Sequence, residues 1–202
     1  MLYRKAYDKL KRWKGQKRRT ALCIQGARQI GKTTLVREFG KNEYACFLEF
    51  NFVSDADARS VFDGNLDANT LIEGLSALAR QPLVPGNTLV LFDEIQECPN
   101  ARTAIKFLVE DGRFDYIETG SFLGEKNNVV RSLPVGFEDL YTMYPMDFEE
   151  FMLANGVQRT TIDAMREAYD ARKPVSDVIH VTICRLPSET ATCAMFSGQR
   201  MT

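Results

Sequence analysis

The most informative segment of the chain reads Gly26-Ala27-Arg28-Gln29-Ile30-Gly31-Lys32-Thr33. It matches the pattern G-x-x-x-x-G-K-[ST] at every fixed position, which is typical of a loop that binds phosphate groups. Its glycines allow backbone N–H groups to curl around phosphate oxygens, and the helix that follows adds the positive end of its dipole. An apolar run precedes the segment and a helical pattern follows it, so the sequence predicts a strand, a phosphate-binding loop and a helix in that order.

The side chains of this loop have distinct expected roles. Lys32 can reach the β- and γ-phosphates of a nucleotide, and the hydroxyl of Thr33 can coordinate Mg²⁺. Arg28 can contact either a phosphate or an acidic side chain on a neighbouring element, and the sequence does not decide between them. The complete set of predicted nucleotide-binding residues is Gly26, Ala27, Arg28, Gln29, Ile30, Gly31, Lys32, Thr33 and Thr34.

Two adjacent carboxylates follow the apolar run Thr88–Phe92. An acidic residue at the carboxyl end of a buried parallel strand faces the crevice in which ligands bind. We therefore expect Asp93 to hold Mg²⁺ through a water molecule, and Glu94 to polarise the water that attacks the γ-phosphate. The adjacency of an aspartate and a glutamate indicates hydrolysis by water rather than transfer of the phosphoryl group to a bound acceptor.

The rest of the pattern predicts an α/β fold in which a parallel five-stranded sheet is flanked by helices. The apolar runs are nearly continuous, as expected for strands that are buried on both faces. The predicted strands are Thr20–Gln25, Tyr44–Asn51, Thr88–Phe92, Phe114–Thr119 and Asp139–Tyr144. The predicted helices between them are Lys32–Phe39, which ends at Gly40, then Asn69–Arg80, and then Asn100–Asp111, which ends at Gly112.

A small helical segment is predicted after the sheet. Asp147 is a candidate N-cap with Glu150 three residues later, which is the capping-box pattern, and this helix runs to Asn155-Gly156. A second helix spans about Thr161 to Arg172. The predicted organisation is a basic N-terminal helix in residues 1–19, a nucleotide-binding core in 20–146, the helical segment in 147–180 and an irregular tail in 181–202.

The charge of the chain is unevenly distributed. Its 202 residues carry a net charge of −1, but residues 1–20 hold nine of the 26 basic residues and one of the 27 acidic ones. This basic stretch is a candidate contact for nucleic acid. The alternative is a solvated amphipathic helix whose apolar face carries Leu2, Ala6, Leu10 and Trp13. No apolar run approaches the roughly 20 residues of a membrane-spanning helix, so no membrane partner is expected.

The five cysteines have no CxxC spacing, and two of them, Cys23 and Cys46, lie in strand-like apolar runs. Buried free cysteines behave as small hydrophobic residues, which fits a reducing compartment, so we expect a cytoplasmic protein. The spacing of the cysteines and of the single histidine, His180, does not predict a structural zinc site.

Four segments share a pattern with a known family. They are Gly26–Thr34 with the Leu-Val-Arg-Glu-Phe that follows it, Leu91–Pro99, Glu118–Ser121 and Met143–Phe151. Together they resemble a prokaryotic family of AAA+ ATPases over about residues 1–180. The resemblance implies an AAA+-like P-loop NTPase fold, ATP as the nucleotide and Mg²⁺ as the metal. Members of that family usually carry a further C-terminal domain, so we expect this chain to be truncated after its AAA domain, with residues 181–202 a native end or the product of a frameshift.

The resemblance also implies a residue that senses the γ-phosphate after the fourth predicted strand. We favour Ser121 for this role, with Thr119 as the alternative. In many members of the family a basic residue, an arginine finger, stands where this chain has Phe137. Arg131 and Arg102 are the candidate replacements, and Arg131 would need a homo-oligomer in order to act across a subunit boundary.

These predictions support two functions of different kinds. The first is a Mg²⁺-dependent ATPase that uses Glu94, Lys32 and Ser121 as catalytic residues, holds its metal with Thr33 and Asp93, and turns hydrolysis into a conformational change. The alternative is a nucleotide-switched module that binds nucleic acid or protein with little turnover. A small-molecule kinase is a weaker third interpretation, because it gives Glu94 no task and no acceptor pocket is recognisable.

Overall fold

The computed structural model describes residues 2–16, 20–79, 81, 83–121 and 136–186. The chain divides into two units, one formed by residues 6–143 and the other by residues 1–5 together with 144–202. The finer predicted division at residues 19, 146 and 180 stays a prediction.

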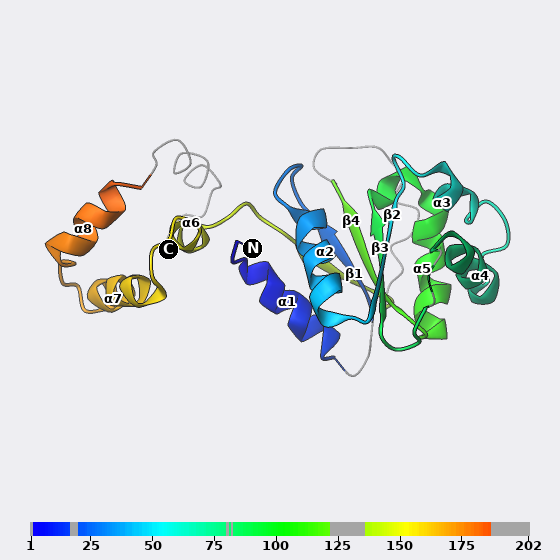
Figure 1. Ribbon diagram of the computed structural model, residues 1–202, viewed down its shortest axis with the longest axis horizontal. Coiled ribbons are helices and arrows are strands. Elements are labelled where there is room, and N and C mark those ends of the chain that lie inside the picture. Colours follow the sequence, from blue (N-terminus) through cyan, green and yellow to red (C-terminus); the bar gives the residue numbers. More distant parts are fainter. Residues whose placement is uncertain (1, 17–19, 80, 82, 122–135, 187–202) are drawn as a thin grey trace. The chain divides into compact units, whose positions relative to one another are not determined.

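The larger unit is built on a five-stranded sheet in the order β2-β3-β4-β1-β5 (Figure 1). The strands are β1 (Ala21–Gln25), β2 (Cys46–Asn51), β3 (Thr88–Asp93), β4 (Asp115–Gly120) and β5 (Glu138–Thr142). All neighbouring strands run parallel, which confirms the predicted α/β class and its parallel five-stranded sheet. The carboxyl ends of all five strands therefore meet at one edge, where ligands bind in folds of this kind.

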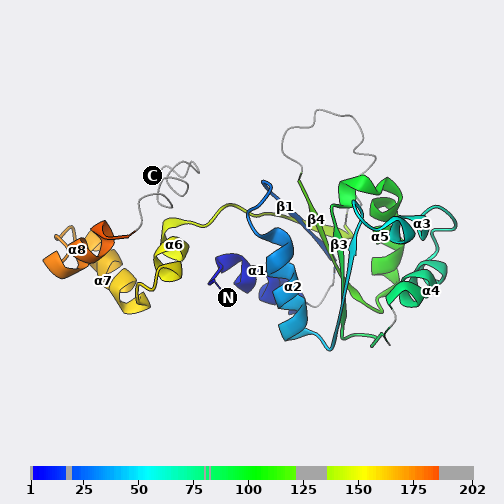
Figure 2. The same ribbon diagram turned by 45° about the horizontal axis from the view of Figure 1, so that its top comes forward.

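Helices cover both faces of this sheet (Figure 1, Figure 2). On one face lie α1 (Lys5–Lys14) and α2 (Lys32–Glu43), and on the other lie α3 (Ala56–Ser60), α4 (Ala68–Ala79) and α5 (Pro99–Asp111). A short 3-10 helix, η1 (Ile95–Glu97), follows β3. The sequence pattern did not predict α3, because five residues are too few to show a helical period; it is N-capped by Asp55, which accepts a hydrogen bond from the Ala58 N–H (2.9 Å).

The core fixes the end of β3, from which the predicted metal-binding carboxylate projects. All six residues of this strand are buried. The ring of Phe92 lies 5.5 Å from that of Phe52, 5.7 Å from that of Phe62 and 6.0 Å from that of Tyr116, measured between centroids. Aromatic pairs at these distances add to the stabilisation that burial alone gives. The residue after Phe92 is therefore held by a rigid neighbour.

The helix after the phosphate loop is longer than predicted. We expected it to end at Gly40 with a left-handed cap, but α2 continues to Glu43. Gly40 lies inside the helix, where a Cβ atom would overlap the ring of Phe47 on β2. The glycine serves close packing of α2 against the sheet, which is a tertiary effect that the local pattern does not reveal. The cap predicted at Gly112 is confirmed, since this residue ends α5 with a φ of 72°.

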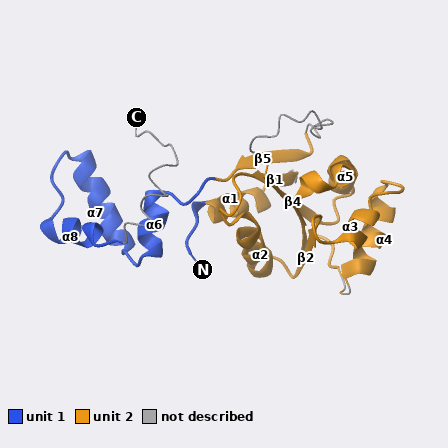
Figure 3. Cartoon of the chain, turned by 90° about the horizontal axis from the view of Figure 1, so that it is seen from above, with its two compact units in different colours: residues 1–5, 144–202 blue, residues 6–143 orange. Residues whose placement is uncertain are grey.

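The smaller unit contains α6 (Phe148–Ala154), α7 (Arg159–Asp170) and α8 (Asp177–Cys184) among its described residues (Figure 3). The predicted capping box of α6 is confirmed: the Asp147 carboxylate accepts from the Glu150 N–H (2.8 Å), and the Glu150 carboxylate accepts from the Asp147 N–H (3.0 Å). Both ends of this reciprocal pair satisfy backbone donors that the first turn would otherwise leave unpaired.

The start of the expected irregular tail at residue 181 is wrong. Residues 181–184 belong to α8 and are helical, and residues 187–202 lie outside the described part of the chain. Ser176 provides the N-cap of this helix, a local signal that we did not use when we assigned the tail. Within the described residues, no helix combines the length and the apolar character needed to cross a bilayer.

Several basic residues of the N-terminal stretch are paired with acidic side chains of their own unit. In the smaller unit, Lys5 Nζ lies 2.7 Å from carboxylate oxygens of both Asp147 and Glu149. In the larger unit, Lys11 and Lys14 lie 3.5 Å and 3.8 Å from the carboxylate of Glu43. The apolar face of α1 is buried through Ala6, Leu10 and Trp13, as the amphipathic interpretation expected, whereas Leu2 precedes the helix and is 53% exposed. Part of the positive charge of this stretch is therefore matched locally.

Candidate nucleotide-binding site

The loop between β1 and α2 has the backbone conformation that a phosphate cradle needs. Gln29 and Gly31 both have positive φ angles, 64° and 89°. Gly31 is also the N-cap of α2 and makes no side-chain capping hydrogen bond. No side chain of Gly31 therefore caps the first N–H groups of α2. Such N–H groups at a helix N-terminus can bind an anion.

Gly26 is required by a close backbone approach. A Cβ atom at this position would overlap the carbonyl oxygen of Met143 and come within 2.9 Å of the side chain of Ile30. Since φ is 156° here, an L side chain would also be strained. The first glycine of the motif therefore lets the loop pass directly against the chain at the end of β5.

Lys32 is held at the centre of the loop. It is 7% exposed, and its Nζ donates hydrogen bonds to the carbonyl oxygens of Gly26 (3.0 Å) and Ala27 (2.8 Å). Burial lowers the pKa of Lys32, although the negative charges of Glu94 and Asp93 oppose this shift. The backbone carbonyls thus position the ammonium group beside the loop. The group is close enough to interact electrostatically with the carboxylates of both Glu94 and Asp93.

The carboxylate of Asp93 accepts hydrogen bonds from three side chains of the site. It is 5% exposed. Its Oδ1 accepts hydrogen bonds from the hydroxyls of Thr33 (2.9 Å) and Thr119, and its Oδ2 accepts one from the side-chain amide of Asn51 (2.9 Å). These donors come from α2, β4 and β2, so the folded sheet orients a single carboxylate from three directions.

Asn51 is a site residue that the sequence analysis missed. It ends β2 directly opposite Asp93 in the parallel register, and its own Oδ1 accepts from the N–H of Val53 (3.0 Å). A polar residue at the end of a predicted strand was the available signal, because neighbouring parallel strands bring such residues to the same edge.

The residues present fit a Mg²⁺ ion. An aspartate and a threonine hydroxyl, hydrogen-bonded to each other beside a loop that can supply phosphate oxygens, form the oxygen donor set that this ion takes in nucleotide sites. When Mg²⁺ is bound, Thr33 and Asp93 would hold it, directly or through water.

Glu94 lies next to Asp93 in a strained backbone conformation. Its φ and ψ are 56° and 50°, in the left-handed region, and it immediately precedes η1. Its Oε2 accepts a hydrogen bond from the side-chain amide of Gln96 (2.5 Å). A non-glycine residue in this region costs about 1–2 kcal/mol, and such residues gather at functional sites. The turn directs the side chain of Glu94 into the cavity described next, rather than along the strand.

A cavity of about 580 Å³ lies over the loop, within the size range of small-molecule sites. It brings together most of the predicted binding residues with Glu94 and Ser121, while Gly26, Ala27 and Ile30 do not line it. The lining residues are Arg28, Gln29, Gly31, Lys32, Thr33, Thr34, Val53, Glu94, Gln96, Glu97 and Ser121.

The two candidates for the sensor role are placed differently. The hydroxyl of Thr119 donates a hydrogen bond to Asp93, so it orients the carboxylate that is predicted to bind the metal. Ser121 lines the cavity, and its buried Oγ has no hydrogen-bond partner among the described residues. Of the two candidates, Ser121 is the one that lines the cavity, and its sensor role stays a prediction.

Of the two arginine-finger candidates, one lies in the part of the chain that the structure describes. Arg131 lies outside the described residues. Arg102 is on α5, and its guanidinium lies 3.1 Å from the carboxylate of Glu138 on β5, with a side chain that is 15% exposed. An arginine enclosed in this way does not project toward a second subunit, so Arg102 is not a suitable replacement.

Comparison with known proteins defines the class. A family model described as an AAA domain matches residues 18–152, more than half of the chain. The chain therefore belongs to this family of AAA+ nucleotide-binding ATPases, which confirms the resemblance and the P-loop fold inferred from the sequence.

No curated protein matches the chain, but a solved structure supports this fold. The structure of the ORC1 protein of Aeropyrum pernix in complex with DNA is 13% identical with a TM-score of 0.51, covering 99% of this chain and 63% of that one. PCH-2 of C. elegans is 12% identical with a TM-score of 0.42, covering 75% of this chain and 41% of that one. The chain thus spans less than two thirds of either protein, and the likeness to the A. pernix structure bears on the fold alone.

Proposed function

We propose that the chain binds ATP with Mg²⁺ and hydrolyses it to ADP and phosphate, and that this turnover drives a conformational change. The observation that carries the proposal is the meeting of Lys32, Thr33 and Glu94 around one cavity, with Asp93 hydrogen-bonded to Thr33. The phosphate loop and the strand end that carry these residues are separate in sequence, and the sheet brings them to one edge. Membership of an ATPase family supports the same conclusion.

Each residue has a chemical task in this reaction. Lys32 and the N-terminal N–H groups of α2 neutralise the negative charge of the phosphates, where most of the catalytic stabilisation arises. When bound, Mg²⁺ would supply positive charge that helps to neutralise the phosphates. Thr33 and Asp93 are fixed beside the loop to hold it, and Asn51 and Thr119 keep the Asp93 carboxylate in one orientation.

Glu94 acts on the attacking water. Its carboxylate accepts a proton from the water as the new bond to phosphorus forms and the bond to the leaving ADP oxygen breaks. The hydrogen bond from Gln96 orients this carboxylate, and Ser121, which also lines the cavity, offers a hydroxyl for the γ-phosphate. The strained backbone at Glu94 holds its carboxylate in place directly after Asp93, the residue that would hold the metal.

The proposal is tested by separating binding from turnover. Lys32→Ala should weaken ATP binding by roughly two orders of magnitude, whereas Glu94→Gln should keep ATP affinity and slow phosphate release at least about 100-fold. Lys41→Ala and Glu110→Gln are matched controls, because both side chains are exposed and lie outside the site. Wild-type turnover by Glu94→Gln would show that the base has been assigned wrongly.

A second candidate function is nucleotide-switched binding of nucleic acid. The basic N-terminal stretch supports it, as does the DNA complex in which the A. pernix protein was solved. The local ion pairs of Lys5, Lys11 and Lys14 reduce the charge available for it, so we place it second. Filter binding of DNA with and without ATP over a salt series tests it, since binding through phosphates must weaken steeply as salt rises.

A further inference from the structure

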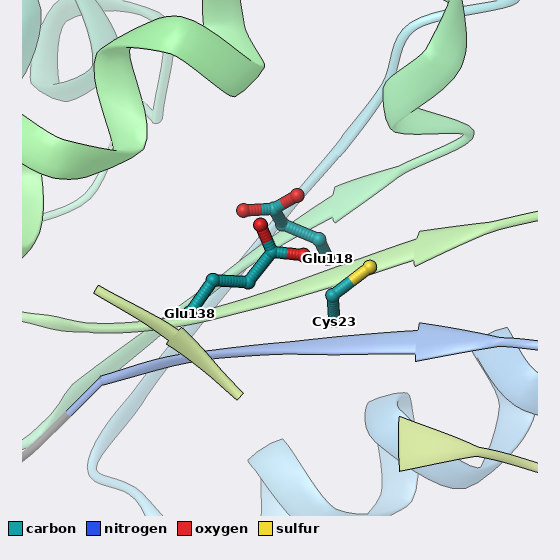
Figure 4. A group of neighbouring side chains, drawn as sticks. All are labelled: Cys23, Glu118 and Glu138. Atoms are coloured by element: carbon teal, nitrogen blue, oxygen red, sulfur yellow. The ribbon is translucent and has the colours of Figure 1, made fainter. Parts of the chain in front are cut away.

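A second group of chemically active side chains lies on the α5 face of the sheet, within the larger unit. It consists of Cys23 on β1, Glu118 on β4 and Glu138 on β5 (Figure 4). Cys23 and Glu118 are register partners, and Glu138 is paired with Ala21, two residues before Cys23. Side chains at these positions share a face because the period of a strand is two.

The three side chains are close enough to share one ion. The Sγ of Cys23 and one carboxylate oxygen from each glutamate all lie within 4.8 Å of one another. The side chain of Glu138 is 4% exposed, and Cys23 is fully buried. The group is therefore enclosed by the protein, unlike the acidic clusters that solvent covers on protein surfaces.

Glu118 is the anomaly that points to a ligand. It is 0% exposed, and neither of its carboxylate oxygens has a hydrogen-bond partner among the described residues. Burial of a carboxylate without compensation costs several kcal/mol or more, on the order of the penalties seen for unpaired buried charges. A side chain placed in this way is stable only with a proton or a cation, and Figure 4 shows that it projects into the same space as Glu138.

The charges of the surrounding groups balance around a divalent ion. A thiolate and two carboxylates carry three negative charges, and a divalent cation together with the guanidinium of Arg102 carries three positive ones. Arg102 Nη2 donates to both oxygens of Glu138 (3.1 and 3.5 Å), the kind of outer hydrogen bond that orients a ligating carboxylate.

We infer that Cys23, Glu118 and Glu138 bind a divalent cation of the zinc type, with Arg102 positioning Glu138. The mixed sulfur and oxygen donor set selects this class, because Mg²⁺ and Ca²⁺ take oxygen ligands only. Three protein ligands leave one tetrahedral position for water. The ion would link β1, β4 and β5, two of which lead directly to the phosphate loop and to Ser121.

The first test uses cobalt as a spectroscopic probe. The full chain is stripped with a chelator and titrated with Co²⁺, and we expect a near-ultraviolet sulfur-to-cobalt charge-transfer band that saturates. Cys23→Ser should abolish the band, and Glu118→Gln should weaken Co²⁺ affinity at least about tenfold. Cys98→Ser and Asp93→Asn are matched controls that should keep the band, since neither residue belongs to the group. A wild-type protein with no band, or a band that survives in Cys23→Ser, overturns the inference.

The second test uses only the wild-type protein, so its result does not depend on whether a variant folds. Zinc-edge X-ray absorption on the wild-type chain loaded with Zn²⁺ should show one sulfur ligand among oxygen neighbours, and a shell without sulfur overturns the inference. Neither test involves nucleotide, and Lys32→Ala should leave both signals unchanged. The site and the proposed ATPase activity can therefore fail independently of each other.

Discussion

Asp93 and Glu118 are buried carboxylates on adjacent strands, yet their surroundings are opposite. Their strands are in register at Phe92 and Glu118, so Asp93 and Thr119 follow as the next residues and project from the other face. Asp93 faces α2 and receives hydrogen bonds from three side chains, whereas Glu118 faces α5 and has no partner among the described residues. Two residues one strand apart therefore occupy different electrostatic environments.

The difference shows how a carboxylate becomes a site. Donors that approach Asp93 fix the orientation of its carboxylate, so a hydrated ion can be exchanged there with each nucleotide. Glu118 lacks donors and is stable only when a proton or a cation joins it. The first environment suits a metal that comes and goes with substrate, and the second suits one that stays.

The largest expected effect on ATP hydrolysis comes from removing the charge of Asp93, the carboxylate with three side-chain donors. Asp93→Asn should lower the steady-state rate of ATP hydrolysis by roughly 10²–10³, because the charge that holds the metal is lost. Asp170→Asn, an exposed aspartate in the smaller unit, is the control and should leave the rate unchanged. A residual rate within a few-fold of wild type would remove Asp93 from the site.

The second expected effect is a pH dependence of stability that Glu118 causes in the metal-free protein. Burial, and to a smaller extent the negative charge of Glu138, raises the pKa of Glu118 from 4.5 to about 8. The positive charge of Arg102 opposes this shift. Between these two pH values the folded chain holds a proton that the unfolded chain has released. The free energy of unfolding should therefore fall as pH rises through this window, by up to about 1.4 kcal/mol per pH unit.

Glu118→Gln provides the comparison for this pH dependence. It removes the titration, so urea unfolding at a series of pH values, with chelator present, should give a flatter curve than wild type between pH 4.5 and 8. Cys23 (β1), Glu138 (β5) and Arg102 (α5) face the same space and remain in both proteins. Parallel curves would show that Glu118 is ionised when folded.

A smaller effect is expected from weakening the support of Asp93. Thr119→Val removes one hydroxyl donor while keeping the shape of the side chain, and should lower the hydrolysis rate about tenfold, roughly the value of one hydrogen bond to a charged group. Thr119→Ser retains the hydroxyl and should restore most of the rate. Equal losses in both variants would mean that packing, and not the hydrogen bond, is responsible.

The smallest effect is expected at Asn51. Asn51→Ala removes one donor to Asp93 and the acceptor that fixes the turn at Val53, and should cost about 1–2 kcal/mol of stability with a few-fold loss in hydrolysis. Thermal unfolding and phosphate release measure the two parts. An unchanged rate would leave Thr33 and Thr119 as the donors that matter.

The local patterns predicted what depends on short stretches of sequence. The phosphate loop, the strand that ends at Asp93 and the capping box at Asp147 each lie within about ten residues, and the structure contains all of them. The length of α2 was wrong, because the reason for Gly40 lies on β2, in the ring of Phe47.

What could not be predicted depends on strand order. Asn51 and Thr119 reach Asp93 because β2 and β4 flank β3. Cys23, Glu118 and Glu138 meet because β4 and β5 flank β1, and nothing in their sequence spacing resembles a metal-binding motif. Their positions follow from parallel register, which is set by the whole sheet and not by any one segment.

The tight passage of Gly26 past Met143 has a mechanical consequence. The N–H of Met143 donates to the carbonyl of Gln25 (2.8 Å), and Met143 is the last residue of the larger unit. A pull on the polypeptide beyond this point is therefore delivered, through one backbone hydrogen bond, to the residue that precedes the phosphate loop. Force applied there reaches the backbone next to the phosphate loop, although Gln25 and Met143 do not themselves line the nucleotide cavity.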